Sequence, residues 1–94
     1  MNLHITEAAK AALQRLVVDS GLKEPYVALV AGTDLHGKNW GWNVGLYARD
    51  RITAETPGNW IIQIEEFSFL IDSQLQPNLN GKSLDFKEGH FRVR

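Results

Sequence analysis

An alternation of large apolar residues with smaller or polar ones over residues 40–49 constrains the fold of this chain most. The apolar residues occupy every second position and are Trp40, Trp42, Val44, Leu46 and Ala48. Successive side chains of a β-strand point to opposite faces of the sheet, so this period of two predicts a strand that buries one face. The preceding run Tyr26–Ala31 is rich in β-forming residues and predicts another strand, with a loop over residues 32–39 between the two.

An amphipathic helix is predicted near the start of the chain. Thr6 is typical of an N-cap, because its hydroxyl can accept a hydrogen bond from a free backbone N–H of the first turn. Gly21 is typical of the residue that ends a helix in the left-handed conformation. Between them, apolar residues recur at helical spacing and form the stripe Ala9, Ala12, Leu13, Leu16 and Val17. We therefore predict a helix over residues 6–19 that packs this stripe against the core.

The remainder of the chain predicts short strands separated by turns. A loop is expected over residues 50–59, a turn at Glu65-Glu66, and one helical turn within residues 72–80. The predicted strands are Trp60–Ile64, Phe67–Ile71, Ser83–Phe86 and Phe91–Val93. One helix and about six strands indicate an α+β, mainly β domain, with the helix on a twisted, mostly antiparallel sheet. The expected inner face of the sheet consists of Trp40, Trp42, Val44, Leu46, Phe67, Phe69 and Ile71.

Composition narrows the classes of function. The 94 residues show no linker or repeat, so we expect a single domain over residues 1–94. Ten basic and 11 acidic residues give a net charge of −1, which indicates neither a nucleic-acid partner nor a membrane partner. Residues 1–5 do not resemble a signal peptide, and no apolar run approaches the ~20 residues of a membrane span, so a cytoplasmic protein is expected. The absence of cysteine excludes disulfides, thiolate nucleophiles and cysteine-ligated clusters.

The titratable residues do not predict an active site. His4, His36 and His90 share no metal-ligand spacing, and we expect them to be solvated; His4 and His90 would meet only if both termini paired in one sheet. Asp34 and His36 share a loop and are weak metal candidates, since two ligands are fewer than a stable site normally has. No nucleophile, base and orienting group can be assembled, so we expect no enzyme, no catalytic residue and no cofactor-binding residue.

Two glycines stand inside the strand over residues 40–49. Gly41 and Gly45 weaken a strand unless it bulges there or another backbone approaches closely. One interpretation is a local bulge. The other is a face that meets a second copy or a partner protein, with Leu35 and Gly37 of the neighbouring loop as further contact residues.

The order of these elements resembles the HesB-like, A-type iron–sulfur carrier (IscA-like) family. The segment Ile5–Ala9 resembles the I-T-x-x-A-A start of that family's helix, and Gly89–Phe91 resembles its closing strand. Residues Ile71–Phe86 are similar to the family block V-D-x-x-S-x-x-x-L-x-G-x-x-L-D-F, with matches at Asp72, Leu79, Gly81, Leu84, Asp85 and Phe86. The resemblance implies a mixed β pseudobarrel, as an open barrel or a two-layer sheet, with one N-terminal helix.

The departures from the family bear on function. The family holds iron or clusters on three cysteines, and its loop cysteine corresponds here to Leu35, or to His36 if the alignment shifts by one. The resemblance therefore implies a cysteine-free, divergent member that serves iron–sulfur cluster biogenesis through protein binding, as a homodimer or with a partner, and carries no cluster. Two alternatives stay open: a mononuclear metal binder that uses Asp34 and His36, and a relative with an unrelated binding or structural role.

Overall fold

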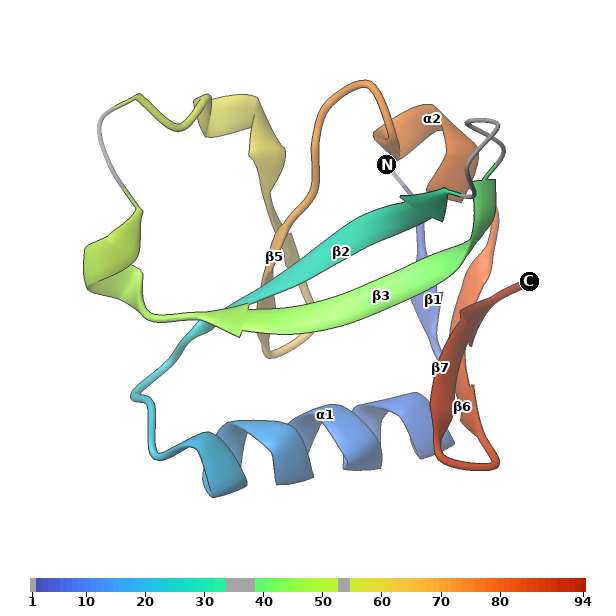
Figure 1. The fold of residues 1–94 in the computed structure, drawn as a ribbon, viewed down its shortest axis with the longest axis horizontal. Helices are drawn as coiled ribbons and strands as arrows, with labels where there is room; N and C mark the ends of the chain where they lie inside the picture. Colours follow the sequence, from blue (N-terminus) through green and yellow to red (C-terminus); the bar gives the residue numbers. More distant parts are fainter. Residues whose placement is uncertain (1, 34–38, 53–54) are drawn as a thin grey trace.

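The computed structural model describes residues 2–33, 39–52 and 55–94 (Figure 1). Short 3₁₀ turns at Arg49–Arg51 and Gly58–Trp60 lie at the two ends of the segment predicted as a loop and extend one residue beyond it on each side. The helices and strands are β1 (His4–Ile5), α1 (Glu7–Ser20), β2 (Tyr26–Thr33), β3 (Asn39–Tyr47), β4 (Ile61–Ile64), β5 (Phe67–Leu70), α2 (Gln76–Leu79), β6 (Ser83–Lys87) and β7 (His90–Val93). The predicted α+β, mainly β class is confirmed. Among the described residues, no helix is long and apolar enough to cross a membrane.

Helix α1 has the two capping residues that the sequence predicts and spans Glu7–Ser20, one residue later at each end than the predicted 6–19. The Thr6 hydroxyl accepts a hydrogen bond from the Ala9 N–H at 3.2 Å, and Gly21 takes a left-handed conformation with φ of 71°. The helix packs on the core through Ala9 and Leu13, both fully buried. The prediction that Leu16 is buried is wrong, since its exposed fraction is 38%. Leu16 lies on the flank of the helix, beside a groove that Phe86 and Phe91 also line.

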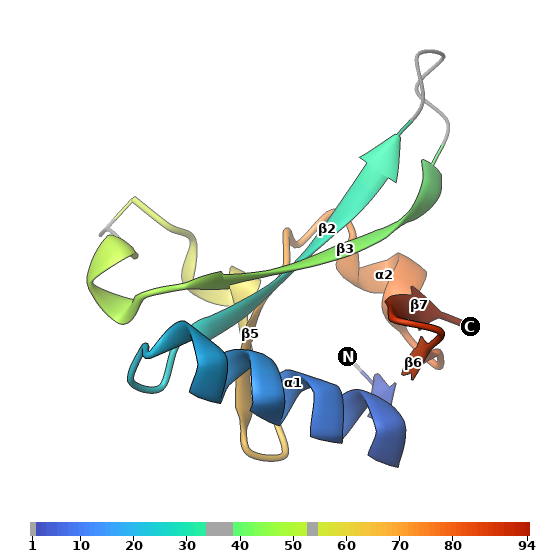
Figure 2. The same ribbon diagram turned by 60° about the horizontal axis from the view of Figure 1, so that its bottom comes forward.

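The strands form two sheets. The larger has the order β3-β2-β5-β4, and the smaller has the order β1-β6-β7. The pairs β2–β3, β4–β5 and β6–β7 are antiparallel, whereas β2–β5 and β1–β6 are parallel. Helix α1 lies on one side of the β2–β3 ribbon, and β6 and β7 stand beside its N-terminal end (Figures 1 and 2). The two-residue strand β1 falls in a segment for which the sequence predicts no strand.

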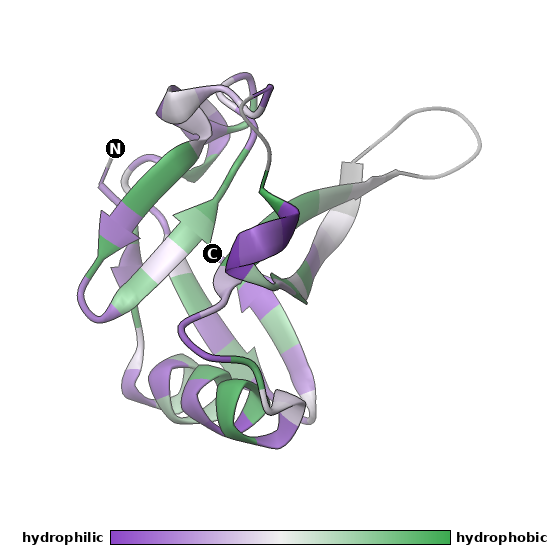
Figure 3. Ribbon diagram, turned by 90° about the vertical axis from the view of Figure 1, so that its left-hand side faces the viewer, coloured by the Kyte–Doolittle hydropathy of each residue, from purple (hydrophilic) through white to green (hydrophobic). Residues whose placement is uncertain are grey.

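The period of two holds along β3, whereas β2 buries the successive residues Val27, Ala28 and Leu29. Val27 and Leu29 of β2 are buried, and they pair with Leu46 and Val44 of β3, which pack partly buried against the same core. Figure 3 shows hydrophobic and hydrophilic residues interspersed along the strands. Of the predicted inner face, Phe67, Phe69 and Ile71 are buried and Trp42 is partly buried against them; the side chain of Trp40 lies outside the described part of the structure.

The turn between β4 and β5 carries charges that contact α1. The ammonium of Lys10 lies 3.2 Å from a carboxylate oxygen of Glu65, and this hydrogen bond raises the pKa of Lys10. Gln14 Nε2 donates to Glu66 Oε1 at 3.0 Å. The interpretation of Glu65-Glu66 as a charged turn is therefore confirmed, and the turn connects the larger sheet to the helix.

Candidate functional site

The structure places only two of the six residues proposed for a site. Asp34, Leu35, His36 and Gly37 lie outside the described residues. Gly41 and Gly45 lie in β3, at positions alternate to the half-buried Trp42, Val44 and Leu46. A Cβ atom at either glycine would meet no other atom within 4 Å.

The bulge interpretation explains one of these glycines. The register of the β2–β3 pair shifts between Gly32, which faces Gly41, and Thr33, which faces Asn39. An irregularity therefore lies next to Gly41, where glycine relaxes the backbone. Gly45 faces Ala28 in a regular part of the ladder, so the bulge does not account for it.

Gly45 belongs to the outer face of the larger sheet, which is the face opposite to the buried residues of β2 and β5. Helix α1 packs on the inner face only. The outer face exposes Val30 by 51%, Tyr47 by 45% and Ile61 by 36%. These are three of the five large hydrophobic residues exposed in the described chain, and the other two lie on α1.

A hollow of about 240 Å³ opens on this outer face. Its lining residues are Ala28, Leu29, Val30, Tyr47, Trp60, Leu70, Asp72 and Leu75. Ala28 is only 3% exposed, and its neighbour on β3 is Gly45, which adds no side chain next to it. The hollow therefore has an apolar lining with one carboxyl group, that of Asp72.

Asp72 is held by the turn that leads into α2. Its Oδ1 atom accepts a hydrogen bond from the Gln74 N–H at 2.9 Å. Its backbone carbonyl accepts from the N–H groups of Leu75 and Gln76 at 2.8 and 3.2 Å. Asp72 Oδ2 accepts no hydrogen bond from any residue that the structure describes. One carboxylate oxygen is thus available to a binding partner.

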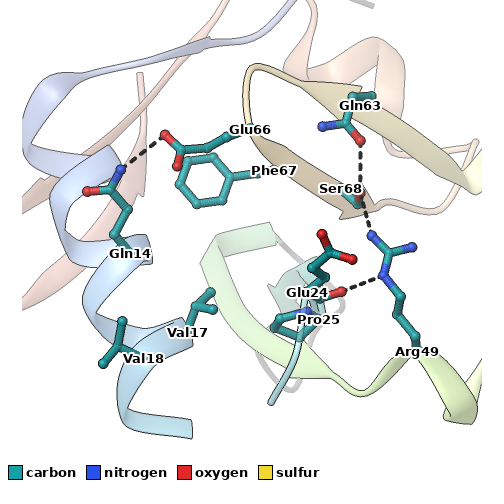
Figure 4. Close-up of a pocket in the computed structure, with 10 residues that line it drawn as sticks. All are labelled: Gln14, Val17, Val18, Glu24, Pro25, Arg49, Gln63, Glu66, Phe67 and Ser68. Atoms are coloured by element: carbon teal, nitrogen blue, oxygen red, sulfur yellow. Dashed lines mark hydrogen bonds between the residues drawn. The ribbon is translucent and has the colours of Figure 1, made fainter. Parts of the chain in front are cut away.

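A second, more polar hollow of about 520 Å³ lies between the end of α1 and the start of β2 (Figure 4). Arg49 crosses it. Its Nε donates to the Glu24 carbonyl at 2.6 Å, its Nη1 to the Tyr26 hydroxyl at 3.1 Å and its Nη2 to Ser68 Oγ at 3.1 Å. The guanidinium also lies 4.6 Å from the centroid of the Tyr26 ring.

The three hydrogen bonds of the Arg49 guanidinium indicate that this residue has a structural role. Each of its three nitrogens donates to a group of this chain, so the guanidinium joins the turn before β2 to β2 and β5. Sequence reasoning placed Arg49 at the end of a strand and missed these contacts. No motif surrounds it, and its acceptors lie 19 to 25 residues away along the chain.

The two described histidines, His4 and His90, do not converge. His4 faces Ser83 and His90 faces Lys87, so the two histidines lie on different strands at opposite ends of β6. Within residues 2–33, 39–52 and 55–94, no three histidine, aspartate or glutamate residues gather closely enough to hold a metal ion. The chain has no cysteine, so its residues do not fit an iron–sulfur cluster, which is normally held by thiolates.

Comparison with known proteins identifies the fold and nothing finer. No protein-family model and no curated protein matches the sequence. A protein from Aquifex aeolicus, solved by NMR, shares 17% identity with a TM-score of 0.68, over 100% of this chain and 94% of its own. IscA with a 2Fe–2S cluster shares 18%, with a TM-score of 0.59, over 98% of this chain and 80% of its own.

Escherichia coli SufA, described as involved in the biosynthesis of iron–sulfur clusters, shares 16% identity with a TM-score of 0.60, over 100% of this chain and 85% of its own. The chain therefore has the fold of IscA and SufA. The fold expected from the sequence resemblance is confirmed.

Proposed function

We propose that this protein is a non-catalytic, IscA-like domain that serves iron–sulfur cluster biogenesis by binding another protein and carries no cysteine-ligated cluster of its own. The outer face of the larger sheet is the proposed contact surface. The observation that carries the proposal is the gathering of exposed Val30, Tyr47 and Ile61 on that face.

Two physical arguments support a binding role. Exposed apolar residues that gather on one face mark interaction sites more often than scattered ones do. The sequence also lacks the thiolates that would let the domain hold a cluster, so the proposal assigns it a role through contacts with other molecules. The IscA and SufA structures supply the link to iron–sulfur biogenesis by fold alone.

The proposal is tested by capturing partners from the native cell with a tagged protein and a Val30→Asp variant. Val30 is 51% exposed, so the new carboxylate remains solvated and the fold is retained. The matched control is Val18→Asp, at a 77% exposed position of α1. We expect iron–sulfur assembly or cluster-carrying proteins to be captured by the native chain and by Val18→Asp, and to be lost with Val30→Asp.

Two results would overturn the proposal. Equal recovery with Val30→Asp would show that the outer face is not the contact surface. Recovery of partners with no connection to iron–sulfur proteins would instead favour an unrelated binding role.

A further inference from the structure

We infer that the hollow on the outer sheet face receives one large apolar side chain of the partner, from a segment that places a basic group beside Asp72. This inference rests on the proposed function and specifies the chemistry of the partner. It follows from the size of the hollow, its lining and its charge.

The size of the hollow selects a single side chain. Pockets for drug-sized ligands usually have volumes of about 300–1,000 Å³, and the volume here is about 240 Å³. Protein interfaces commonly concentrate their binding energy in one or a few anchor side chains that fill such pockets. The hollow therefore matches an anchor residue and is too small for a bulky cofactor.

The lining selects an apolar anchor. Ala28 and Leu70 provide apolar surface from neighbouring strands, and Trp60, Tyr47 and Val30 line the same hollow. Burial of an apolar group against this surface is favourable in proportion to the area removed from water. An aromatic anchor would gain further from edge-to-face contacts with the two aromatic rings.

The charge selects a basic neighbour of the anchor. Among the described residues that line the hollow, Asp72 is the only charged one. It is half-buried, and its Oδ2 accepts no hydrogen bond within the described part of the chain. A cationic group of the partner would pair with this oxygen, and Tyr47 and Trp60 add aromatic rings that attract cations. An anionic group would be repelled.

The experiment uses small probes that carry these two features. Phenethylammonium combines an aromatic ring with a cation; phenylacetate has the ring with the opposite charge, and ethylammonium has the charge without the ring. Each is titrated into the ¹⁵N-labelled protein while backbone amide shifts are recorded. We expect phenethylammonium to shift the amides of Ala28, Val30, Tyr47, Leu70 and Asp72 saturably, and the other two probes to shift them weakly.

Asp72→Asn isolates the charge. Asparagine retains a side-chain oxygen to accept from the Gln74 N–H, so the turn is preserved. We expect about two- to fivefold weaker phenethylammonium binding, the range of a partly exposed ion pair, and unchanged binding with the control Asp19→Asn on exposed α1. Val30→Ser removes apolar surface from the lining and is expected to weaken binding while Asp72 is intact.

Three results would overturn the inference: phenylacetate shifting the same amides equally, phenethylammonium shifting amides away from the hollow, or Asp72→Asn binding the probe as the native protein does. None of these three results contradicts the proposed function, provided that partner capture still depends on Val30. Loss of the proposed function would appear instead as capture that Val30→Asp does not affect.

Discussion

The hydroxyl of Thr6 donates a hydrogen bond to Asp85 Oδ1 at 2.8 Å while it accepts one from the Ala9 N–H at 3.2 Å. One side chain thus caps α1 and connects its first turn to β6, across 79 positions of the sequence. Arg94 Nη2 lies 2.9 Å from Asp85 Oδ2 and brings the end of the chain to the same carboxylate. The start of the helix and the smaller sheet are therefore stabilised together.

Substitution of Thr6 by Ala should weaken this junction. The loss of an N-cap costs about 0.5–2 kcal/mol, and here the Asp85 carboxylate loses a donor as well. Thr6→Ser keeps the hydroxyl and should retain most of the stability. Urea unfolding of the three proteins measures the difference, and a Thr6→Ala protein as stable as the native one would contradict the role assigned to this residue.

Asp85 should make stability depend on pH in the acid range. The Thr6 hydroxyl and then the Phe86 N–H hold the pKa of Asp85 below its ordinary value of 3.8, and Arg92 and Arg94 act in the same direction. A lowered pKa stabilises the fold above the ordinary value, and this stabilisation is lost as pH falls through the lower, folded-state pKa.

Asp85→Asn is the variant that tests this dependence. The native protein should be more stable than Asp85→Asn at pH 7, and the gap should narrow as the pH falls below about 3.8. Urea unfolding across this range measures the gap. A constant gap would show that the ionised carboxylate contributes nothing.

Two leucines on α1 should respond differently to truncation. Leu13 is fully buried, so Leu13→Ala should lower the free energy of unfolding by about 2–5 kcal/mol. Leu16 is 38% exposed, and Leu16→Ala should cost clearly less. Thermal or urea unfolding compares the two variants, and equal costs would mean that the helix packs on a different face.

The sequence predicts those parts of the fold that depend on local chemistry. Thr6 and Gly21 mark the ends of α1, and the period of two separates the faces of β3, because caps and strand alternation are set by neighbouring residues. The exposure of Leu16 could not be predicted, since helical spacing gives the width of an apolar stripe and not how much of it the sheet covers. The parallel pairs β1–β6 and β2–β5 each join segments that are distant in the sequence, and no local pattern indicates them.

The candidate site shows the same limit. Gly45 indicated the outer face, because a glycine inside a strand needs a reason. The hollow also needs Trp60 and Asp72, which come from the 3₁₀ turn before β4 and from the turn before α2. Only the tertiary structure brings these residues next to Val30. For the loop residues Asp34 and His36, the metal hypothesis lies outside the described residues and stays a prediction.

Anaerobic reconstitution with iron and sulfide should leave the purified protein colourless. Iron–sulfur clusters are held mainly by cysteine thiolates, and the chain has none. Absorption in the visible range after removal of unbound iron sulfide is the measurement. A stoichiometric chromophore that stays with the protein would contradict the proposed cluster-free role.

The final prediction contrasts three glycines. Gly45→Val should be folded and as stable as the native protein or more so, by up to about 1 kcal/mol, since valine favours strands and a Cβ meets nothing within 4 Å there. Gly41→Val should also fold but gain less, because the register of the β2–β3 pair shifts beside Gly41. Gly21→Val should lose about 1–2 kcal/mol, because its φ of 71° is left-handed. Partner capture should rank the variants in the opposite order to their stability. Gly45→Val adds a side chain beside the hollow and should recover less partner protein, while folded Gly21→Val should recover as much as the native protein. Capture unchanged by Gly45→Val would place the contact surface elsewhere.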